Sequence, residues 1–463
     1  FINFRITNSF YQSKVKTILE GENSFGAGTQ GIGKTANVEF VSANPTGPLT
    51  VGHGRQAVLG DTVSSILKWH GYDVTREYYY NDAGRQMRLL GESVYTRYME
   101  ILGKEAELPE NGYEGEYIRD IAQEIFSDHN DSLKDDGENL IFKEKAEETI
   151  FAHIRKTLGN VGIEMDSYVN EKTFYDDGSI DSVVAELREQ GLAYDADGAV
   201  WFKTTKLGKD QDTVLIKSSG EPTYRLPDIA YHCQKVKRGF DLIVDIFGTD
   251  HQATYPDVLA GVEKLGNKID HIRVLIHQFV TLKSAGEKVK MSTRKAEYVT
   301  LQELIESVGV DVVRYFFIMR GMQSHLNFDL ELATKESEEN PVYYLQYAHA
   351  RICNIIKFGK EAGVISDHKL DLSLLVELSE LRLIKEIIRF PEVAQSALEI
   401  LEPQIIANYL QEVATSFHKF YTECRVITDD AELTTARLAL VSATRVVLAN
   451  GLTILGISRP ERM

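Results

Sequence analysis

The stretch of sequence that decides the fold covers residues 44–55 and reads NPTGPLTVGHGR. Residues 38–41 before it (VEFV) alternate like a short buried strand, and residues 56–70 after it carry apolar residues at helical spacing until Gly71. A tight Gly/Pro turn between a strand and a helix is half of a nucleotide-binding unit, because N–H groups at the helix start can meet phosphate oxygens. The stretch therefore predicts an α/β domain with a ligand site at this turn.

Length and composition indicate a multidomain globular protein. At 463 residues the chain exceeds one ordinary hydrophobic core, and we expect about two to four domains. Its three cysteines, Cys233, Cys353 and Cys424, lie far apart and match neither a disulfide framework nor a zinc pattern, which favours the reducing cytoplasm. The net charge of −18 argues against non-specific coating of nucleic acid, although local basic patches can still hold it.

Neither a membrane segment nor a leader is expected. The most apolar segment, residues 436–457, is interrupted by Arg437, Arg445 and Asn450, which indicates a packed helix. The chain opens with FINFRI in the middle of a strand-like alternation, without a charged-then-apolar secretory pattern. We interpret residues 1–35 as the remnant of an amino-terminal domain and a linker.

Strand and helix signals divide the rest of the chain. Residues 36–95 read as strand, helix and strand, and residues 96–215 as a charged helical insertion with strands near its end. Residues 216–335 supply the second half of the α/β unit, and residues 336–463 are almost wholly helical. The predicted architecture is a split parallel α/β domain with an inserted α+β domain, followed by an all-α helical bundle.

The Gly-rich segment SFGAGTQGIGK (residues 24–34) resembles a phosphate-binding loop only superficially. Its glycines do not keep the GxxxxGK[ST] spacing, and no strong strand leads into it. We predict a linker here.

Two motifs could together form an ATP site. Gly52 lets a ligand approach the backbone, and His53 at a helix start can donate to a phosphate oxygen, although such a histidine is often only a cap or a surface residue. Residues 288–295 (KVKMSTRK) form a cationic loop that could neutralise a pyrophosphate leaving group; alone it would read as an exposed basic turn. A helix-start histidine early in a split nucleotide fold and a basic loop after its last strand favour the functional interpretation of both.

TVGH and KMSTR resemble the two signatures of class I aminoacyl-tRNA synthetases, usually written HIGH and KMSKS. The blocks VEFVSANPTGPLTVGHGR, YYYNDAGRQ, EPTYRLPDIAYH, GTDH, VKMSTRK, NPVYYLQYAHARI and the final RPERM together resemble arginyl-tRNA synthetase. They run from residue 38 to the last residue, so the resemblance covers nearly the whole chain. It implies a Rossmann-like catalytic domain and a helical anticodon-binding domain.

The resemblance also implies roles for single residues. A carboxylate suits a guanidinium as a forked partner, and a buried tyrosine can wall the slot; the alternative for Asp228 is a helix N-cap after Pro227. The implied arginine-binding residues are Glu39, Ser42, Asn44, Tyr224, Asp228 and Gln252. The implied ATP-binding residues are Gly52, His53, Gly248, Asp250, His251, Lys290, Met291 and Ser292, with Thr50, His53 and Lys290 as the catalytic group. ATP would arrive with Mg²⁺, and no structural metal is expected.

Two positions depart from the family signatures. Thr50 replaces the first histidine of HIGH; it can still hydrogen-bond a phosphate oxygen but carries no charge. Thr293 replaces the second lysine of KMSKS and leaves Lys290, Arg294 and Lys295 to supply positive charge. A rate cost is the expected consequence.

In the helical domain, aromatic and basic side chains interleave in a way that suits unstacked bases and phosphates, although helical tyrosines are often core residues. The implied tRNA-binding residues are Tyr343, Tyr347, Arg351 and Met463. The resemblance implies a monomeric arginine–tRNA ligase acting on tRNA(Arg), L-arginine and ATP, with tRNA needed before arginine is activated. Two alternatives are open: a small-molecule nucleotidyltransferase that shares TxGH, and a non-catalytic relative that binds tRNA or senses arginine.

Overall fold

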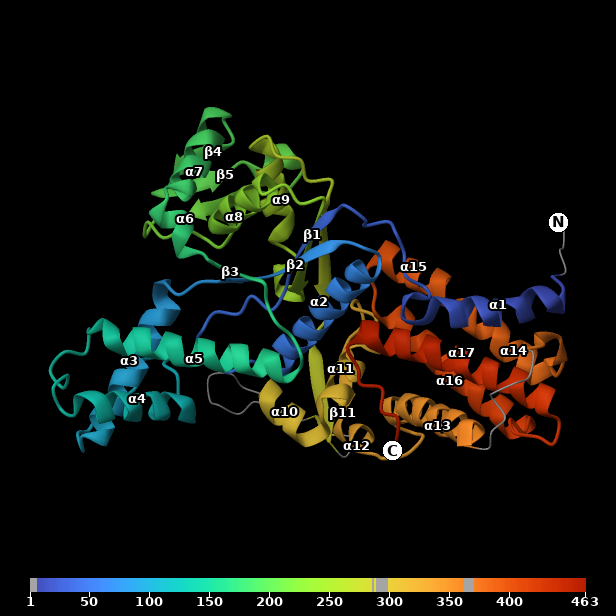
Figure 1. Cartoon of the computed structure of the whole chain (residues 1–463). Helices are drawn as coiled ribbons and strands as arrows, with labels where there is room; N and C mark the ends of the chain where they lie inside the picture. The colour runs from blue at the N-terminus through green and yellow to red at the C-terminus, as the bar shows by residue number, and fades with distance from the viewer. Residues whose placement is uncertain (1–5, 285–286, 289–298, 362–369) are drawn as a thin grey trace.

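The computed structural model describes residues 6–284, 287–288, 299–361 and 370–463. Its centre is a five-stranded parallel sheet in the order β3-β2-β1-β7-β8 (Figure 1). The strands are β1 (Thr35–Glu39), β2 (Asp73–Tyr80), β3 (Ser167–Asn170), β7 (Leu242–Gly248) and β8 (Ile272–His277). Val38 of β1 is paired with Arg76 of β2 on one side and with Val244 of β7 on the other. The chain order reverses at β1, which creates a crevice beyond the carboxyl ends of β1 and β7, where open α/β sheets bind ligands.

The helix predicted after the Gly/Pro turn is α2 (Val51–Trp69), and it packs on β1, β2 and β7. Thr50 caps its amino end, and Gly71 follows its carboxyl end with φ +88°, a conformation that favours glycine. The Gly-rich segment before β1 forms turns against the carboxyl end of α2, where the N–H of Gly31 donates to the carbonyl of His70 at 2.8 Å. A strand follows Lys34 where a phosphate loop would need a helix, which argues against a phosphate loop here; the linker assignment stays a prediction.

The segment predicted as an insertion is not one continuous domain. Three helices, α3 (Gly84–Ile101), α4 (Glu116–His129) and α5 (Leu140–Asn160), pack on one another and lie on the side of the sheet away from the helical domain (Figure 1). β3 then pairs with β2 and returns the chain to the central sheet, which corrects the 96–215 boundary. The pairing is non-local, and β3 has only four residues, so no local pattern announced it.

A second hydrophobic cluster lies above the sheet. Tyr79, Phe174, Leu187, Phe202 and Tyr231 are among its buried members. Its elements are α6 (Lys172–Asp176), α7 (Ser179–Glu189), an antiparallel sheet of β4 (Ala193–Ala196), β5 (Ala199–Phe202) and β6 (Thr213–Ile216) with η2 (Thr204–Leu207), and the helices α8 (Arg225–Lys237) and α9 (Tyr255–Lys264). The short 3-10 helix η3 (Thr249–His251) follows β7 in the connection to α9.

The chain passes from the central sheet to a second, smaller sheet after β8. β8 ends at His277, and β9 (Val280–Ser284) belongs to a small sheet with β10 (Glu287–Lys288) and β11 (Leu326–Asp329). β9 and β10 precede residues 289–298 in the chain, and β11 follows them; residues 289–298 themselves lie outside the described residues. The helices α10 (Leu301–Val308), α11 (Val310–Ile318) and α12 (Leu330–Ala333) complete this part.

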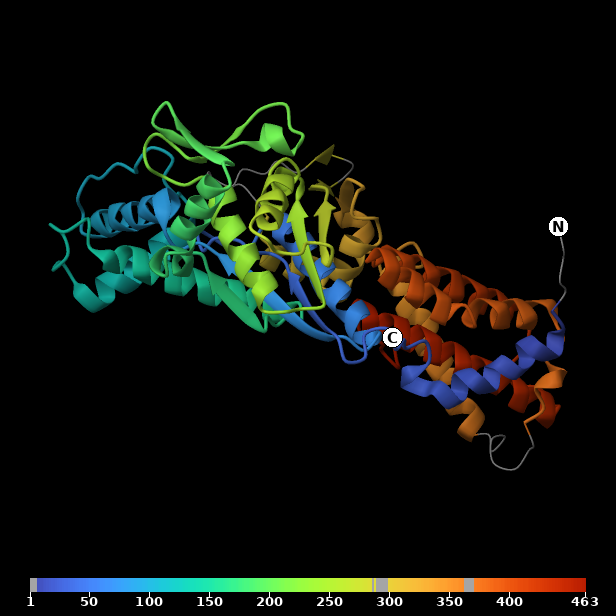
Figure 2. The same ribbon diagram turned by 90° about the horizontal axis from the view of Figure 1, so that it is seen from above.

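The helical domain contains both ends of the described chain (Figure 2). Its helices are α13 (Pro341–Glu361), α14 (Leu378–Ile387), α15 (Phe390–Ile400), α16 (Gln404–Glu423) and α17 (Ala431–Leu455), with η4 (Leu372–Leu374). The first helix, α1 (Asn8–Gly21), which is followed by η1 (Glu22–Ser24), packs on α17 and α14. Asn450 of α17 donates to the carbonyls of Glu22 and Phe25 at 2.9 and 3.1 Å. Residues 8–24 therefore belong to the bundle, which corrects their assignment to a separate remnant and linker.

Among the described residues, α17 alone is long and apolar enough to cross a membrane by length and composition. Most of its apolar segment is buried inside the bundle, and Arg437 within it pairs with Glu380 of α14 at 2.7 Å. This agrees with the packed helix predicted for residues 436–457.

Candidate active site

The chain turns sharply where it leaves β1 at the crevice. Val41 and Ser42 have φ values of 68° and 43°, in the left-handed region that L-residues rarely adopt. Such backbone strain concentrates at functional sites. The turn leaves the Ser42 hydroxyl 3.0 Å from Glu39 Oε1 and brings the N–H of Tyr79 to Ser42 Oγ at 3.1 Å. The three residues are thereby fixed against one another at the ends of β1 and β2.

Thr50 and His53 form a reciprocal cap at the start of α2. The N–H of His53 donates to Thr50 Oγ1 at 3.4 Å, and the N–H of Thr50 donates to His53 Nδ1 at 3.2 Å. Because Nδ1 accepts a hydrogen bond, the proton of the neutral ring lies on Nε2, which remains a donor. Burial lowers the pKa of His53 to about 4, against the opposing charge of Asp250. His53 is therefore an uncharged donor at the positive end of a helix.

Gly52 and Gly54, the two glycines of Gly-His-Gly, differ in the space around them. A Cβ at Gly54 would lie 2.5 Å from Leu301 Cδ1, so this position needs glycine for the packing of α2 against α10. Gly52 is exposed, and among the described residues a Cβ there would meet only Thr50 Oγ1, at 3.6 Å. Its small size is thus not required by the fold and leaves space above the first helical turn.

Residues Lys290, Met291 and Ser292 lie outside the described residues, together with Thr293, Arg294 and Lys295. The chain on their carboxyl side is nevertheless anchored at the first signature. Thr300 forms a β-bridge with Thr50, and the N–H of Leu301 donates to the carbonyl of Leu49 at 2.8 Å. The two signature segments, far apart in sequence, are therefore joined at this point.

Residues after β7 lie at the same edge of the sheet. Gly248 ends β7 beside His277 of β8, and Asp250 and His251 follow in η3. The ring of His251 stacks on Phe247 with centroids 4.8 Å apart, and the carboxylate of Asp250 is exposed. Gln252 closes η3 and is exposed. The side chains of Asp250, His251 and Gln252 thus remain open to solvent.

A group of buried charges lies below the crevice. Lys235 of α8 has no exposed surface; it contacts Glu39 and lies 2.7 Å from Asp245 Oδ1. His232 Nδ1 lies 2.8 Å from the carbonyl of Asp228, and Nε2 lies 3.1 Å from Asp245 Oδ2. Both ring nitrogens face acceptors, so the imidazolium form satisfies both contacts; the Asp245 carboxylate raises the pKa of His232 against the effect of burial.

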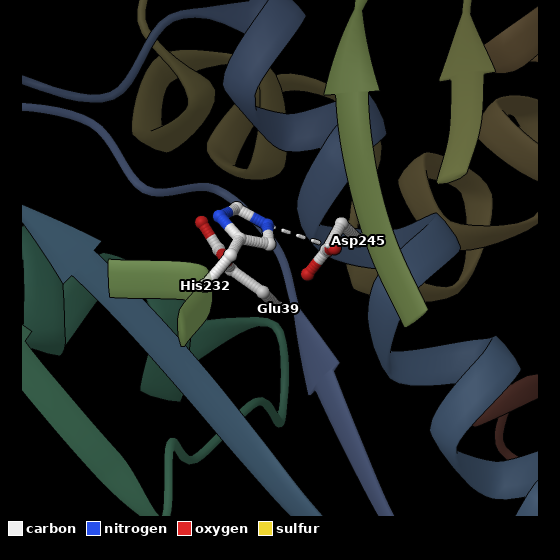
Figure 3. Close-up of side chains that lie close together, drawn as sticks. All are labelled: Glu39, His232 and Asp245. Atoms are coloured by element: carbon white, nitrogen blue, oxygen red, sulfur yellow. Dashed lines mark hydrogen bonds and ion pairs between the residues drawn. The ribbon is translucent and has the colours of Figure 1, made fainter. Parts of the chain in front are cut away.

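Figure 3 shows Glu39, His232 and Asp245 close together, at a spacing that could suit a metal ion. The ammonium of Lys235 already contacts both carboxylates, and His232 donates to one of them. A fixed internal cation fills the place that a metal would take. Glu39 is 2% exposed and accepts hydrogen bonds from Lys235 and Ser42.

Asp228 stands apart from these pairs. It lies in the first turn of α8, four residues after the N-cap Tyr224, so the alternative role of N-cap is wrong. Its carboxylate is partly buried and has no hydrogen-bond donor among the described residues. The pKa of Asp228 is raised to about 7, mainly by burial; the charges of Glu171 and Glu39 contribute to the rise, whereas His232 and Lys235 oppose it. A carboxylate held in this way gains most from a cationic ligand.

Glu171 and Asn81 are site residues that the sequence reasoning missed. Glu171 is 5% exposed and accepts hydrogen bonds from Tyr79 Oη at 3.0 Å and from Asn81 Nδ2 at 2.6 Å. Burial raises the pKa of Glu171, and the two tyrosines Tyr79 and Tyr175 oppose the shift. Asn81 also fixes Asn44, whose Oδ1 accepts from the Asn81 N–H at 2.9 Å. The block YYYNDAGRQ pointed to Asn81, but only the β2–β3 pairing brings Glu171 here.

Tyr224 differs from its expected state. It is 71% exposed, whereas the sequence interpretation placed a buried tyrosine beside Asp228. It lies at the start of α8, and its carbonyl accepts the N–H of Asp228 at 3.2 Å. Its ring is therefore solvated in this structure.

A concave region lies on the helical domain between α13, α16 and the carboxyl-terminal tail. It is a pocket of about 680 Å³ whose lining includes Tyr347, Arg351 and Met463. The ring of Tyr347 lies 6.0 Å from that of Tyr343, tilted by 14°, and the Arg351 guanidinium lies 4.5 Å from the Tyr347 centroid. Tyr347, Arg351 and Met463, three of the four predicted tRNA-binding residues, thus line one pocket. The fourth, Tyr343, stacks on the ring of Tyr347.

Comparisons with known proteins agree with this geometry. The family model "tRNA synthetases class I (R), catalytic domain" matches residues 14–313, and "DALR anticodon binding domain" matches residues 345–463. The chain is 50% identical over 479 residues to the arginine–tRNA ligase of Salinibacter ruber and 51% identical over 466 residues to that of Desulfotalea psychrophila. These matches cover the whole chain and 85% and 84% of the two relatives.

The chain belongs to the arginyl-tRNA synthetase family. A Campylobacter jejuni structure described as an arginyl-tRNA synthetase matches 99% of this chain and 100% of its own, with a TM-score of 0.89 and 32% identity. The Thermus thermophilus arginyl-tRNA synthetase matches 100% of this chain and 87% of its own, with a TM-score of 0.76 and 21% identity, and so supports the fold alone.

As an arginyl-tRNA synthetase, the chain is a class I ligase that activates arginine with ATP and transfers it to tRNA. The predicted fold, a Rossmann-like catalytic domain followed by a helical anticodon-binding domain, is confirmed. The two alternatives, a small-molecule nucleotidyltransferase and a non-catalytic relative, are wrong, because the matches extend through both the catalytic and the anticodon-binding domains.

Proposed function

We propose that the carboxylates of Asp228 and Glu171, near the ends of β1 and β3 and the start of α8, bind the guanidinium of L-arginine. The observation that carries this proposal is the partly buried carboxylate of Asp228, which has no hydrogen-bond donor within the described part of the chain and has Glu171 and Glu39 as neighbouring negative charges. A guanidinium offers five donors in a plane and stays charged, so it meets the unpaired carboxylate as a forked partner. The neighbouring ring of Tyr79, which is held by Glu171, supports the wall of this slot.

The remaining predicted residues serve the backbone end of arginine. Ser42 and Asn44 hold the strained turn after β1, and Gln252 and Tyr224 offer exposed polar groups at the rim. Glu39 acts through Ser42: its carboxylate is already paired with Lys235, so it positions the turn where the resemblance implied a direct contact. Tyr224 becomes covered only when arginine is bound.

ATP is bound on the α2 side of the crevice. The phosphate oxygens accept hydrogen bonds from the Nε2–H of His53, the Thr50 hydroxyl and the backbone N–H groups of the first turn of α2 around Gly52. The nucleoside lies beside Gly248, Asp250 and His251. Lys290, Met291 and Ser292 serve the same nucleotide, with Lys290 neutralising charge on the leaving pyrophosphate. Mg²⁺ enters with ATP, held by phosphate oxygens.

In the first step, a carboxylate oxygen of arginine attacks the α-phosphorus of ATP, and the bond to the β-phosphate oxygen breaks. The products are arginyl-adenylate and pyrophosphate. A 3′-terminal ribose hydroxyl of tRNA(Arg) then attacks the activated carbonyl and releases AMP. The protein needs no covalent nucleophile, because positioning and charge stabilisation supply the rate.

The pocket on the helical domain serves the tRNA. Tyr343, Tyr347 and Arg351 offer a stacked aromatic and cationic platform for unstacked bases, and Met463 covers one side. Occupation of this pocket precedes arginine activation. The enzyme works as a cytoplasmic monomer.

The proposal is tested by arginine-dependent ATP–pyrophosphate exchange with and without tRNA. Citrulline is the matched control substrate, because it has the shape of arginine but carries no side-chain charge. Exchange that requires arginine and tRNA, and fails with citrulline, supports the carboxylates of Asp228 and Glu171 as the specificity site. Comparable exchange with citrulline would show that charge recognition lies elsewhere.

A further inference from the structure

The short loop of residues 321–324 (GMQS) is held by three parts of the molecule. Arg55 lies on α2, two residues after His53, and has no exposed surface. Its guanidinium donates to the carbonyls of Gln278 at 2.6 Å, Ser324 at 3.1 Å and Gly321 at 3.1 Å. A buried arginine that pairs with backbone carbonyls fixes chain positions.

The same loop is tied to the segment between β8 and β9. The N–H of Gln278 donates to the carbonyl of Met322 at 2.9 Å, and Gln323 Nε2 donates to the carbonyl of Ile276 at 3.3 Å. Two residues beyond Gln278 the chain enters β9, which pairs with β10 on one side and with β11 on the other. The loop and Arg55 therefore set the base of the hairpin that leads into the second signature.

The helical domain supplies the third support. Glu402, between α15 and α16, accepts the N–H of Met322 at 3.0 Å through Oε1. A Cβ on Gly321 would lie 2.9 Å from Gln404 Oε1 at the start of α16, so the two domains are in close contact here. The charge of Glu402 opposes the lowering of the Arg55 pKa that burial causes. Arg55 and Glu402 thus both bond to the backbone of the same loop.

We propose that Arg55 and Glu402 are positioning residues for adenylate formation, which hold the 321–324 loop and thereby set the β9–β10 hairpin against the first signature. This inference rests on the proposed role of Lys290, Met291 and Ser292, which follow the hairpin in the chain, in ATP activation. Neither side chain touches a substrate. Their effect is on the step that needs both signatures in register, and a misplacement of about 1 Å is enough to slow such a step about 100-fold.

The test compares Arg55→Lys, Glu402→Gln and the double variant in ATP–pyrophosphate exchange with tRNA. Arg55→Lys keeps the charge but cannot reach three carbonyls, and we expect kcat to fall about 100-fold with the arginine KM within about threefold of wild type. Glu402→Gln should lower kcat by about fivefold, because a neutral acceptor binds the Met322 N–H less strongly. Glu399→Gln, an exposed carboxylate of α15, is the matched control and should leave kcat unchanged.

Because both residues act on one loop, the double variant should lose less than the product of the two single losses. The inference would be overturned if the fold-loss in kcat of the double variant equalled the product of the two single losses. It would also be overturned if the single variants kept the kcat of wild type. Thermal unfolding of each variant separates a positioning effect from a general loss of folding; if Arg55→Lys does not fold, Glu402→Gln against Glu399→Gln decides alone. Wild-type exchange without arginine specificity would instead refute the proposed function, so the two failures are distinguishable.

Discussion

The carboxylate group of Asp228, Glu171 and Glu39 and the pocket between α13 and α16 differ in the kind of side chain that each presents. In the first group, Glu39 and Glu171 are buried and held by hydrogen bonds, whereas Asp228 is partly buried and has no donor among the described residues. The second is lined by stacked rings with one guanidinium above them, and Met463 at its edge is 56% exposed. Charge placed in a dry site discriminates steeply but depends on pH, whereas stacking tolerates variation and depends little on pH.

The largest expected effect breaks the charged side of this comparison. Asp228→Ala removes the unpaired carboxylate, and we expect the arginine KM in ATP–pyrophosphate exchange to rise about 100-fold or more, because truncation of a buried charge partner costs about 2–5 kcal/mol. The ATP KM should stay within about threefold. An arginine KM near the wild-type value would remove Asp228 from the guanidinium site.

The aromatic side is broken by Tyr347→Ala. Loss of the ring should raise the tRNA KM in aminoacylation about tenfold to thirtyfold, because base–aromatic stacking contributes about 1–3 kcal/mol. Tyr347→Phe keeps the ring and should behave as wild type, apart from the lost contact between the hydroxyl and Arg351. If the phenylalanine variant were as weak as the alanine variant, stacking would not be the relevant contact.

A pH profile sharpens the difference between the two sites. With a pKa of about 7, Asp228 in the free enzyme becomes neutral as pH falls through 7, and the arginine KM should rise about tenfold between pH 8 and pH 6. The tRNA KM should show no comparable step. Asp228→Asn should abolish the arginine step, and a step that persists in this variant would belong to another group.

The same carboxylate links arginine affinity to stability. Its pKa is raised in the folded state, so ionisation of Asp228 costs stability as pH rises above its unfolded value, up to its folded pKa of about 7. Asp228→Asn should therefore raise the melting temperature of the arginine-free enzyme at pH 8, and the gain should shrink toward pH 4. A lower melting temperature at pH 8 would mean that the ionised carboxylate has a partner in the fold.

The smallest expected effect concerns Thr50, which both caps α2 and belongs to the proposed ATP site. Thr50→Ala removes the side-chain cap of α2, which should lower the free energy of unfolding by about 1 kcal/mol and loosen the His53 ring. We expect a kcat reduced about threefold, measured by pyrophosphate exchange. Thr50→Ser keeps the hydroxyl and should match wild type; a serine variant as slow as alanine would point to the lost methyl group.

The sequence predicted the parts of the site that depend on local pattern. The Pro/Gly turn and the helical spacing after it predicted a helix start with a donor at His53, and the structure adds the reciprocal cap between Thr50 and His53. Asp228 followed from the family blocks. Glu171 did not, because its role depends on β3 pairing with β2 about 90 residues earlier. Lys235 was equally hidden: a lysine on a helix reads as solvated, and only the buried Glu39 and Asp245 explain it.

The packing of α1 against α17 has a consequence during protein synthesis. Val15 and Ile18 on α1 are fully buried, yet much of the surface that covers them belongs to a helix that starts at Ala431, 410 residues after α1 ends at Gly21. At about 5–20 residues per second, a ribosome needs roughly 20–80 s to make that interval. During this time the apolar face of α1 lacks its native cover, so the nascent chain depends on a chaperone or on transient contacts until its last helix emerges.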